Sequence, residues 1–469
     1  MHTVGPMGRR GIPSTIQWAT AAGAVVLLTA LATPSSASRA PLREVGVEAS
    51  PVTDWPVYHL DAIRSGFDPN TPSIGQLSVA WTAPLDQGVY AEPLVVGGHV
   101  IAATENDTVY SLDPTDGSVL WRRHLGTPVP LNQLPCGNID PLGITGTPAY
   151  DPASGRLFVS AERLKGTTVQ HRLFALDPSD GSVLASRSLD KFENEPAVEQ
   201  QRAALAVGNG HVYVAFGALA GDCGDYHGYV MESATSLTGP LHVYSALKYV
   251  PTAKQGGIWA TAGPSIDALG NVFVAVGNGT TSQTYDLSDS VLKLSASVRL
   301  KTYFAPTTWQ QDNLADADLG SMGPALVGNY VYADGKSGTG YLMKAGHLGG
   351  IGGEIDSEPV CRAFVGTALV ETTLFVPCTD GLRAVDVGSG VISVLWHTAS
   401  AATVGPPVVG GGAVWSVGRD GVLYALKPTT GKLIASISVG PVEHFASPTL
   451  SAGYAFVPTQ AGVTAVSGA

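Results

Sequence analysis

The sequence has few charged residues and lacks the local motifs of several common enzyme classes. Only 14% of its 469 residues are charged, whereas 44% are hydrophobic. It contains no G-x-S-x-G, Walker A or H-E-x-x-H motif and no paired-carboxylate constellation. These absences exclude the sequence signatures of α/β-hydrolases, P-loop nucleotide hydrolases and zincins. They also leave a carbohydrate-active hydrolase without a supporting acid pair.

Cysteine is scarce, and its spacing excludes two kinds of cofactor site. The four cysteines, at 136, 223, 361 and 378, form neither a CxxC nor a CxxCH motif. A thiolate zinc site and a covalently attached c-type haem are therefore not encoded. Four cysteines are compatible with two disulfides outside the cytosol. We predict the pairs Cys136–Cys223 and Cys361–Cys378, the second across adjacent strands.

No apolar run after the N-terminus approaches membrane length. An Arg9-Arg10 pair, the apolar run 18–32 and small residues after it predict a signal peptide over 1–40, followed by a flexible mature N-terminus over 41–53. The alternative is a retained membrane anchor. We expect a secreted or extracytoplasmic protein without stable membrane insertion once the signal is removed.

The charge balance restricts the partners of the mature chain. The first 40 residues contain three arginines and no acidic residue, so the mature chain has 23 basic and 38 acidic residues, a net charge of −15. Such an acidic chain excludes nucleic acid and anionic membranes as partners.

A strand-turn-strand unit recurs along the chain. The segment TVYSLDPTDGSVLW, at 108–121, is repeated at 172–185 and 422–435, with a looser copy at 381–396. Each copy alternates apolar and polar residues on both sides of a turn, which is the pattern of two antiparallel strands. The turn glycines that we expect to adopt positive φ are Gly117, Gly181, Gly390 and Gly431.

A second element, a short strand rich in β-branched and aromatic residues, precedes each unit. It occurs eight times, beginning with GGHVIAA at Gly97 and ending with SAGYAFV at Ser451, at intervals of roughly 40 to 60 residues. This period predicts an all-β, eight-bladed propeller of four-stranded antiparallel blades. The last unit has room for three strands, and LSVAWTA, at 77–83, supplies a fourth. The N- and C-terminal strands should therefore share one blade and close a single domain over 54–469.

The repeat also resembles a known family. The pattern S-x-D-x-x-D-G-x-x-x-W at 111–121 is similar to the tryptophan-docking motif of pyrroloquinoline quinone (PQQ) dehydrogenases, the eight-bladed quinoprotein propellers. The opening DWPVYHLDAIRSGFDP, at 54–69, followed by LSVAW, resembles the start of that family. The resemblance covers essentially the whole chain after residue 50.

The resemblance implies a cofactor site near the ring axis. Trp259 of GGIW corresponds to the tryptophan floor below PQQ, and Lys336 to the cation that contacts the quinone oxygens. Asn278 of VGNG corresponds to a metal-binding asparagine. Asp316 and Asp318 correspond to metal ligands, with an aspartate also serving as catalytic base. The metal would be calcium or a lanthanide.

These residue types suit that chemistry, and each also has a purely structural interpretation. A planar quinone needs an aromatic face, and a hard cation needs carboxylate and amide oxygens. However, Trp259 could equally pack at a blade interface, and Asn278 lies in a Gly-Asn-Gly turn signal. Asp316 and Asp318 also suit a solvated loop, and Lys336 lies in a Gly-rich turn.

The sequence departs from the family at two places. It has no adjacent cysteine pair to cover the quinone, and Cys223 stands where a metal-binding glutamate is expected, with Asp222 and Asp225 beside it. Nearby His227 is either a base or substrate contact or a hydrogen-bonded residue inside a blade. The segment 136–148 is expected to fold over one mouth of the ring, either as a lid or as a seal.

Two functions therefore stay open. The first is a PQQ-dependent oxidoreductase that oxidises an alcohol or sugar and passes electrons to a separate acceptor, because no haem motif is present. The second is a non-catalytic propeller that has lost the quinone site and binds a protein partner as an assembly platform. Convergence of Trp259, Asn278, Asp318 and Lys336 near the ring axis would favour the enzyme.

Overall fold

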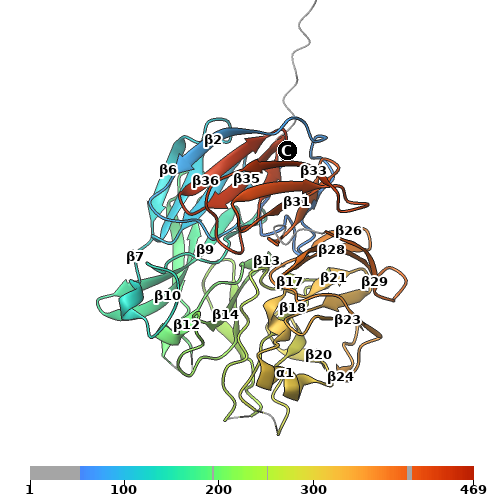
Figure 1. Ribbon diagram of the computed structural model, residues 1–469. Helices are drawn as coiled ribbons and strands as arrows, with labels where there is room; N and C mark the ends of the chain where they lie inside the picture. The colour runs from blue at the N-terminus through green and yellow to red at the C-terminus, as the bar shows by residue number, and fades with distance from the viewer. Residues whose placement is uncertain (1–52, 193–194, 251, 282, 399–403) are drawn as a thin grey trace, which may run out of the picture. The chain divides into compact units, whose positions relative to one another are not determined.

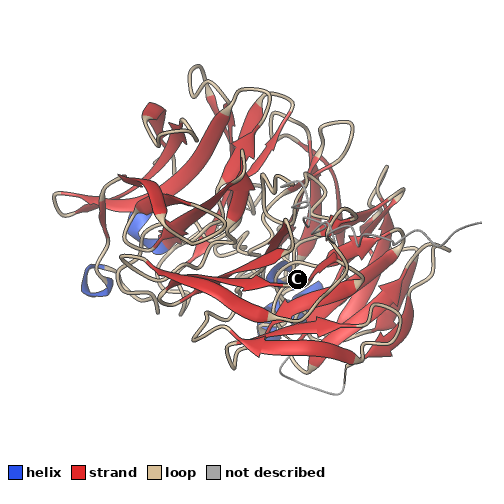
Figure 2. Ribbon diagram, turned by 90° about the horizontal axis from the view of Figure 1, so that it is seen from above, coloured by secondary structure: helices blue, strands red, loops and turns tan. Residues whose placement is uncertain are grey.

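The computed structural model describes residues 53–469, except 193–194, 251, 282 and 399–403. The predicted signal peptide and almost all of the predicted flexible segment lie outside this range. The described chain forms eight β-sheets arranged as the blades of a propeller, which confirms the predicted all-β class (Figure 2). No helix of the described residues is long and apolar enough to cross a membrane. The described helices are η1 (Leu131–Gln133), η2 (Pro196–Val198), α1 (Trp309–Ala315) and η3 (Leu319–Ser321).

The first four blades follow one another along the chain, and each contains four antiparallel strands, to which blades 2, 3 and 4 each add one short strand. Blade 1 contains β3 (Leu94–Val96), β4 (His99–Thr104), β5 (Thr108–Leu112) and β6 (Val119–His124). Blade 2 contains β7 (Thr127–Pro128), β8 (Ala149–Asp151), β9 (Arg156–Lys165), β10 (Thr168–Leu176) and β11 (Val183–Ser188). Blade 3 contains β12 (Glu199–Gln200), β13 (Ala206–Gly208), β14 (His211–Ala218), β15 (Tyr229–Ala234) and β16 (Leu241–Ser245). Blade 4 contains β17 (Ser265–Ile266), β18 (Val272–Val276), β19 (Ser290–Leu294), β20 (Leu300–Ala305) and β24 (Gly350–Ile351).

The remaining blades include the two that contain N-terminal strands. Blade 5 contains β21 (Ala325–Val327), β22 (Tyr330–Ala333), β23 (Thr339–Lys344) and β25 (Asp356–Pro359). Blade 6 contains β26 (Ala368–Val370), β27 (Thr373–Cys378), β28 (Gly381–Asp386) and β29 (Ser393–His397). Blade 7 contains β1 (Phe67–Asp68), β30 (Val408–Gly410), β31 (Ala413–Val417), β32 (Val422–Leu426) and β33 (Leu433–Ser438). Blade 8 contains β34 (Thr449–Ser451), β35 (Tyr454–Thr459), β36 (Gly462–Ser467) and β2 (Ser78–Pro84).

The two ends of the propeller sequence close the ring in blade 8. Strand β2 pairs antiparallel with β36, from Ser78 opposite Ser467 to Pro84 opposite Gly462 (Figure 1). The predicted closure is thus confirmed. Pairing of the terminal strands satisfies backbone groups that would otherwise remain at an open sheet edge.

The repeated motif joins neighbouring blades through a tryptophan. Trp121 at the end of one motif donates its indole N–H to the carbonyl of Pro178 in the next blade at 2.9 Å. Its ring lies against Gly181, where an added Cβ would stand 2.5 Å from a ring carbon. Gly181 also has a φ of 69°, so both space and backbone conformation require glycine. Trp81 and Trp396 make the same contacts with Pro114 and Pro428, respectively, which explains why the motif couples Trp, Pro and Gly.

Both predicted disulfides are present. Cys136 pairs with Cys223, and Cys361 pairs with Cys378. Cys378 lies in β27, but Cys361 lies in the segment between β25 and β26 rather than in a strand. The expectation of adjacent strands was wrong in that detail, since an isolated bridge between Ala363 and Cys378 brings the segment close enough.

The N-terminal segment 54–68 lies against the inner strands of blades far apart in sequence. Its backbone hydrogen bonds reach blades 1, 2, 4, 6 and 7, through the pairs Trp55–Val95, Pro56–Tyr150, Ala62–Ile266, Ser65–Leu369 and Gly66–Val409. This central segment therefore ties together blades that do not neighbour one another in sequence. These hydrogen bonds pair backbone groups of the segment with backbone groups of the blades. The segment can therefore fill the centre of the ring without leaving those groups buried and unpaired.

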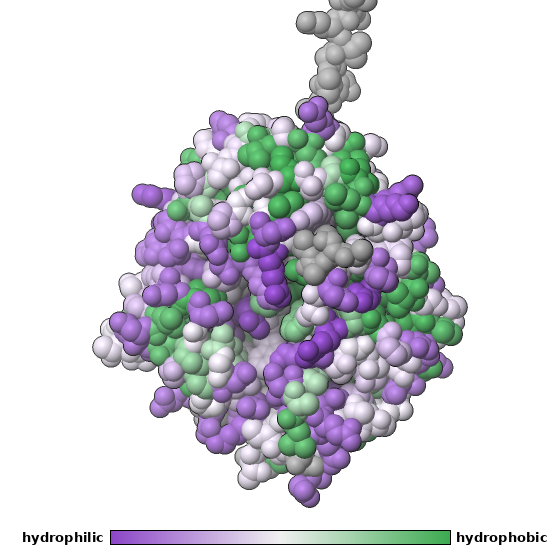
Figure 3. Space-filling model, in the orientation of Figure 1, coloured by the Kyte–Doolittle hydropathy of each residue, from purple (hydrophilic) through white to green (hydrophobic). Residues whose placement is uncertain are grey.

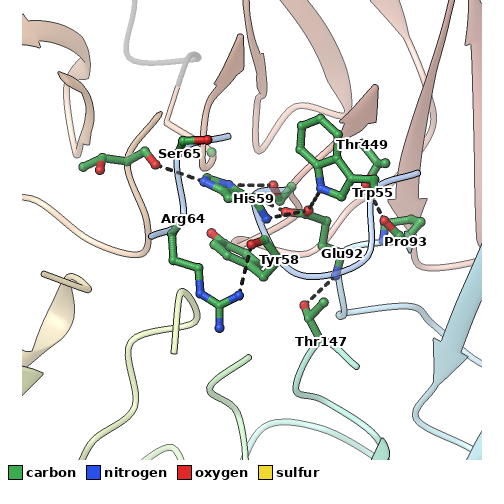
Figure 4. Close-up of polar contacts among 12 residues, drawn as sticks. Trp55, Tyr58, His59, Arg64, Ser65, Glu92, Pro93, Thr147 and Thr449 are labelled. Atoms are coloured by element: carbon green, nitrogen blue, oxygen red, sulfur yellow. Dashed lines mark hydrogen bonds and ion pairs between the residues drawn. The ribbon is translucent and has the colours of Figure 1, made fainter. Parts of the chain in front are cut away.

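A buried carboxylate anchors the central segment (Figure 4). Glu92 Oε1 accepts the indole N–H of Trp55 at 2.6 Å and the backbone N–H of His59 at 2.9 Å. Burial raises the pKa of Glu92 to about 7 and lowers the pKa of His59 to about 3. Neutral His59 donates from Nδ1 to the Thr367 carbonyl at 3.0 Å and accepts the Ser447 hydroxyl at Nε2 at 3.1 Å. Blades 6 and 8 are thereby joined to the segment through one imidazole.

Arg64 provides a second anchor of the central segment. Its guanidinium donates to three backbone carbonyls, those of Tyr58, Leu205 and Pro264, at 3.2, 2.8 and 3.2 Å. The side chain is 5% exposed, and burial lowers its pKa to about 10. Arg64 therefore stays charged at neutral pH and binds blades 3 and 4 to the segment.

We expect Trp121→Ala to destabilise the propeller by about 3 kcal/mol, because it removes a packed indole and its hydrogen bond. Urea unfolding of the purified protein measures this loss. The control is Val119→Ala on the same strand, which changes an exposed side chain and should alter the free energy of unfolding by less than about 0.5 kcal/mol. Equal effects of the two substitutions would contradict the docking role.

Glu92 should make stability depend on pH. A carboxyl whose pKa is raised in the folded state stabilises most below its unfolded pKa, near 4.5, and that contribution is lost as pH rises through 7. Each unit of the shift corresponds to about 1.4 kcal/mol. Relative to Glu92→Gln, the wild-type protein should therefore lose unfolding free energy between pH 4.5 and 8. Urea unfolding of both proteins across this range tests it, and a difference that stays constant with pH would refute the assignment.

Candidate functional site

A cavity of about 200 Å³ lies among loops of blades 3 to 6 and the loop before blade 8. The surface in Figure 3 is hollowed near its middle, and hydrophilic side chains border the hollow. The cavity, called the axial cavity below, is lined by aromatic, cationic and acidic side chains. These side chains include Arg202, Asp222, Trp259, Lys336, Phe364 and Phe445.

Trp259 forms an aromatic wall of the axial cavity and is held on glycine backbone. It lies in the loop between β16 and β17 and is 9% exposed. An added Cβ at Gly277 or Gly217 would stand 2.7 or 3.1 Å from its side chain. Close approach of these backbones fixes the orientation of the indole, which also donates to Asp318 Oδ1 at 3.2 Å. The ring is therefore rigidly held where it meets the cavity.

Asp318 and Lys336 form a buried ion pair below this wall. Asp318 Oδ2 lies 2.6 Å from Lys336 Nζ, and its side chain is fully buried. Burial raises the pKa of Asp318 although the charge of Lys336 opposes the shift. Burial also works against the charge of Lys336, but the two aspartates outweigh it and raise its pKa. Asp316, which is largely exposed, contacts the same ammonium at 2.9 Å.

Asn278 lies near Trp259 but is not among the described residues that line the axial cavity. Its backbone carbonyl accepts the Gly256 N–H at 2.8 Å, which places Asn278 beside the loop that leads to Trp259. Its side-chain Oδ1 is buried and has no hydrogen-bond partner among the described residues. The structure thus joins Trp259, Asp318 and Lys336 by direct contacts and leaves Asn278 as a neighbour.

The three candidate residues near Cys223, namely Asp222, Asp225 and His227, have different surroundings. Asp222 lines the axial cavity, and burial raises its pKa. Asp225 is exposed and pairs with Lys254 at 2.6 Å. The backbone N–H of His227 donates to buried Glu199 at 2.9 Å, and its ring lies 6.1 Å from that of Tyr229. Of the three, only Asp222 lines the described cavity.

Sequence reasoning missed the cationic and aromatic partners opposite Trp259. Arg202 donates to the Trp259 carbonyl at 3.3 Å, and its guanidinium lies 5.3 Å from the centre of the Phe445 ring. Phe364 completes the aromatic lining. Arg202 lies in the loop between β12 and β13, Phe364 in the loop between β25 and β26, and Phe445 in the loop between β33 and β34. No repeat or motif in the sequence distinguishes these three residues.

The arrangement fits a planar anionic group better than a metal ion. The fixed indole and two phenyl rings offer flat apolar faces, and Arg202 and Lys336 offer positive charge. In contrast, Lys336 already forms ion pairs with both Asp316 and Asp318. Within the described residues there is no group of three or more His, Cys, Asp or Glu side chains placed to hold a metal. The metal role of Asn278, Asp316 and Asp318 stays a prediction.

The segment 136–148 packs behind the lining of the axial cavity. Ile139 and Leu142 pack against Leu219, which lines the axial cavity, and the Cys136–Cys223 disulfide fixes the segment to the same region. This contact explains why the segment is both apolar and longer than a turn.

Solved structures share this fold at low sequence identity. The quinohemoprotein alcohol dehydrogenase of Comamonas testosteroni is 15% identical, with a TM-score of 0.67 over 88% of this chain and 80% of its own. A europium-containing methanol dehydrogenase is 16% identical, with a TM-score of 0.65 over 87% and 90%. BamB from Moraxella catarrhalis is 15% identical, with a TM-score of 0.56 over 84% and 97%.

Sequence comparison supports the same relationship over part of the chain. Residues 77–222 match a family model described as outer membrane protein assembly factor BamB. No curated protein matches the sequence. The chain therefore has the fold of the PQQ-like repeat propellers, and residues 77–222 match that repeat family in sequence as well.

Proposed function

We propose that the axial cavity binds a planar, anionic quinone of the PQQ class, with which the protein oxidises a small alcohol or sugar. The observation that carries this proposal is the rigid Trp259 wall with Arg202 and Lys336 beside it. The low-identity likeness to quinoprotein dehydrogenases supports the fold but not the chemistry.

The side chains around the cavity have distinct roles in this proposal. Trp259, Phe364 and Phe445 bind the flat faces of the ligand and exclude water. Arg202 attracts its carboxylates, and Lys336 donates to a carbonyl oxygen. When bound, a quinone of this class accepts two electrons from the substrate. The electrons would then pass to a separate acceptor, since the sequence encodes no CxxCH motif for a covalently bound haem.

Asp318 acts as a positioning residue in this arrangement. One oxygen accepts the Trp259 N–H, and the other is held by Lys336. Asp222 is the carboxyl that lines the cavity, and its raised pKa suits it to take a proton from a substrate hydroxyl. We therefore assign the base role to Asp222 rather than to the predicted Asp316 or Asp318.

A second candidate function is a non-catalytic platform that binds a protein partner on the propeller face. The engagement of Asp316 and Asp318 by Lys336 favours it, because the predicted metal ligands are not gathered. The sequence match to an assembly factor supports the same function.

For either function we propose an extracytoplasmic protein with a signal peptide over 1–40 and a propeller over 54–469. The two disulfides support this location because they persist outside reducing compartments.

Titration of the purified protein with PQQ tests the site. We expect binding without added metal, seen as quenching of tryptophan fluorescence and as a bound-quinone spectrum. Trp259→Ala and Lys336→Gln should each weaken binding by at least about tenfold, since they remove a stacking face and a charged hydrogen bond. The control Lys254→Gln changes an exposed lysine outside the cavity and should leave affinity unchanged.

Dye reduction by the same preparation separates the two functions. With alcohols or sugars, alone and with calcium or a lanthanide, the enzyme should reduce the dye, and Asp222→Asn should abolish reduction while retaining PQQ. Binding without reduction under every metal condition would refute the oxidoreductase. Absence of PQQ binding under all conditions would refute the quinone site itself and favour the platform.

A further inference from the structure

A second cavity, of about 230 Å³, lies apart from the axial cavity and shares none of its lining residues. Loops of blades 8, 1 and 7 and the segment 136–148 form it. Its polar lining consists of acids, carboxamides and a phenol, namely Glu105, Asp140, Glu443, Gln87, Gln460 and Tyr90. None of the described lining residues is basic. We call it the acidic cavity.

Glu105 is the buried acid of this cavity. It is 1% exposed, and its Oε2 accepts the Gly143 N–H at 2.8 Å. Its other oxygen, Oε1, is buried and makes no hydrogen bond of normal geometry to the described residues. Burial raises the pKa of this carboxyl to about 8, even though the Gly143 N–H and the nearby Thr145 hydroxyl favour the charged form. A polar atom at this depth without a donor is costly unless a ligand supplies one.

Further acids surround Glu105 on both sides. At the rim, Glu443 accepts the Gln460 side-chain N–H at 2.9 Å, and its charge contributes to the raised pKa of Glu105. Behind Glu105, both carboxylate oxygens of buried Asp107 lack hydrogen-bond partners among the described residues. Glu162 also raises the pKa of Glu105, although it pairs with His171 at 3.3 Å. The charges of Glu162 and Glu443 therefore oppose ionisation of Glu105, and a cation bound in the acidic cavity would favour its charged form.

We propose that the acidic cavity binds an organic ammonium ion. Ammonium N–H groups would donate to Glu105 Oε1 and to Glu443, and the Tyr90 ring offers a face for a cation–π contact. The volume exceeds the roughly 30 Å³ that a water molecule occupies in the liquid, so the cavity holds a molecule of several heavy atoms. The net charge of −12 attracts cations to the protein from a distance. The proposal does not depend on a quinone in the axial cavity.

Calorimetric titration of the full chain at physiological salt tests this site. The probe is 1,4-diaminobutane, and its neutral counterpart 1,4-butanediol has the same carbon chain without charge. We expect the diamine to bind and the diol not to bind. Glu105→Gln and Glu443→Gln should each weaken diamine binding by at least about tenfold, because each removes a charged hydrogen-bond acceptor.

Two control variants distinguish this site from others. Glu358→Gln alters an exposed acid on β25 and should leave diamine affinity unchanged, which excludes a general effect of net charge. Lys336→Gln alters the axial cavity and should also leave it unchanged. Circular dichroism melting confirms that each variant is folded, and the partly exposed Glu443 keeps the test valid if Glu105→Gln does not fold. Equal binding of diol and diamine, or wild-type affinity in folded Glu443→Gln, would overturn the proposal.

Discussion

The buried carboxylate of Glu92 determines how the ring is filled. A propeller closes its sheets edge to edge, but its inner strands still present backbone and side-chain groups toward the centre. Here the central segment 54–68 occupies that space, and Glu92 holds it through Trp55 and the backbone of His59. The imidazole of His59 then forms hydrogen bonds with Thr367 and Ser447, which lie more than 300 residues later in the sequence.

This anchor also defines the space in which the two cavities lie. Tyr58 and Glu92 line a narrow gap of about 20 Å³. Arg202 and Phe445 of the axial cavity border that gap on one side, and Tyr90 and Glu443 of the acidic cavity border it on the other. Displacement of the central segment would therefore alter both cavities, although they share no lining residue.

The fold could be predicted from sequence because its defining interactions are local and repeated. One short motif contains both the Asp-Gly turn and the tryptophan that packs against the next such turn. At Gly181, the close tryptophan ring and the positive φ both require glycine. Closure by β2 followed from the missing strand of the last repeat. Cysteine pairing was also predicted, but the position of Cys361 outside a strand was not, because an isolated bridge leaves no alternating pattern.

The candidate site was predictable only in part, since its geometry comes from loops that converge in space. The family resemblance located Trp259, Asp318 and Lys336, which do make direct contacts. The resemblance did not reveal that Lys336 forms ion pairs with both Asp316 and Asp318. Ion pairs between loops depend on where the side chains lie in space, which the spacing of residues along the sequence does not show. Arg202, Phe445 and Glu105 lie in segments without periodicity, and their importance follows from burial and from the partners they lack or share.

The two cavities differ in whether basic side chains accompany their acids. In the axial cavity, Lys336 pairs with buried Asp318, and Arg202 adds positive charge nearby. In the acidic cavity, burial of Glu105 beside Asp107 and Glu162 is only partly compensated by His171. Unmatched buried charge is destabilising unless it is protonated or paired with a ligand. The propeller therefore retains an unfavourable cluster of acids around Glu105, which is the pattern expected where stability is exchanged for binding.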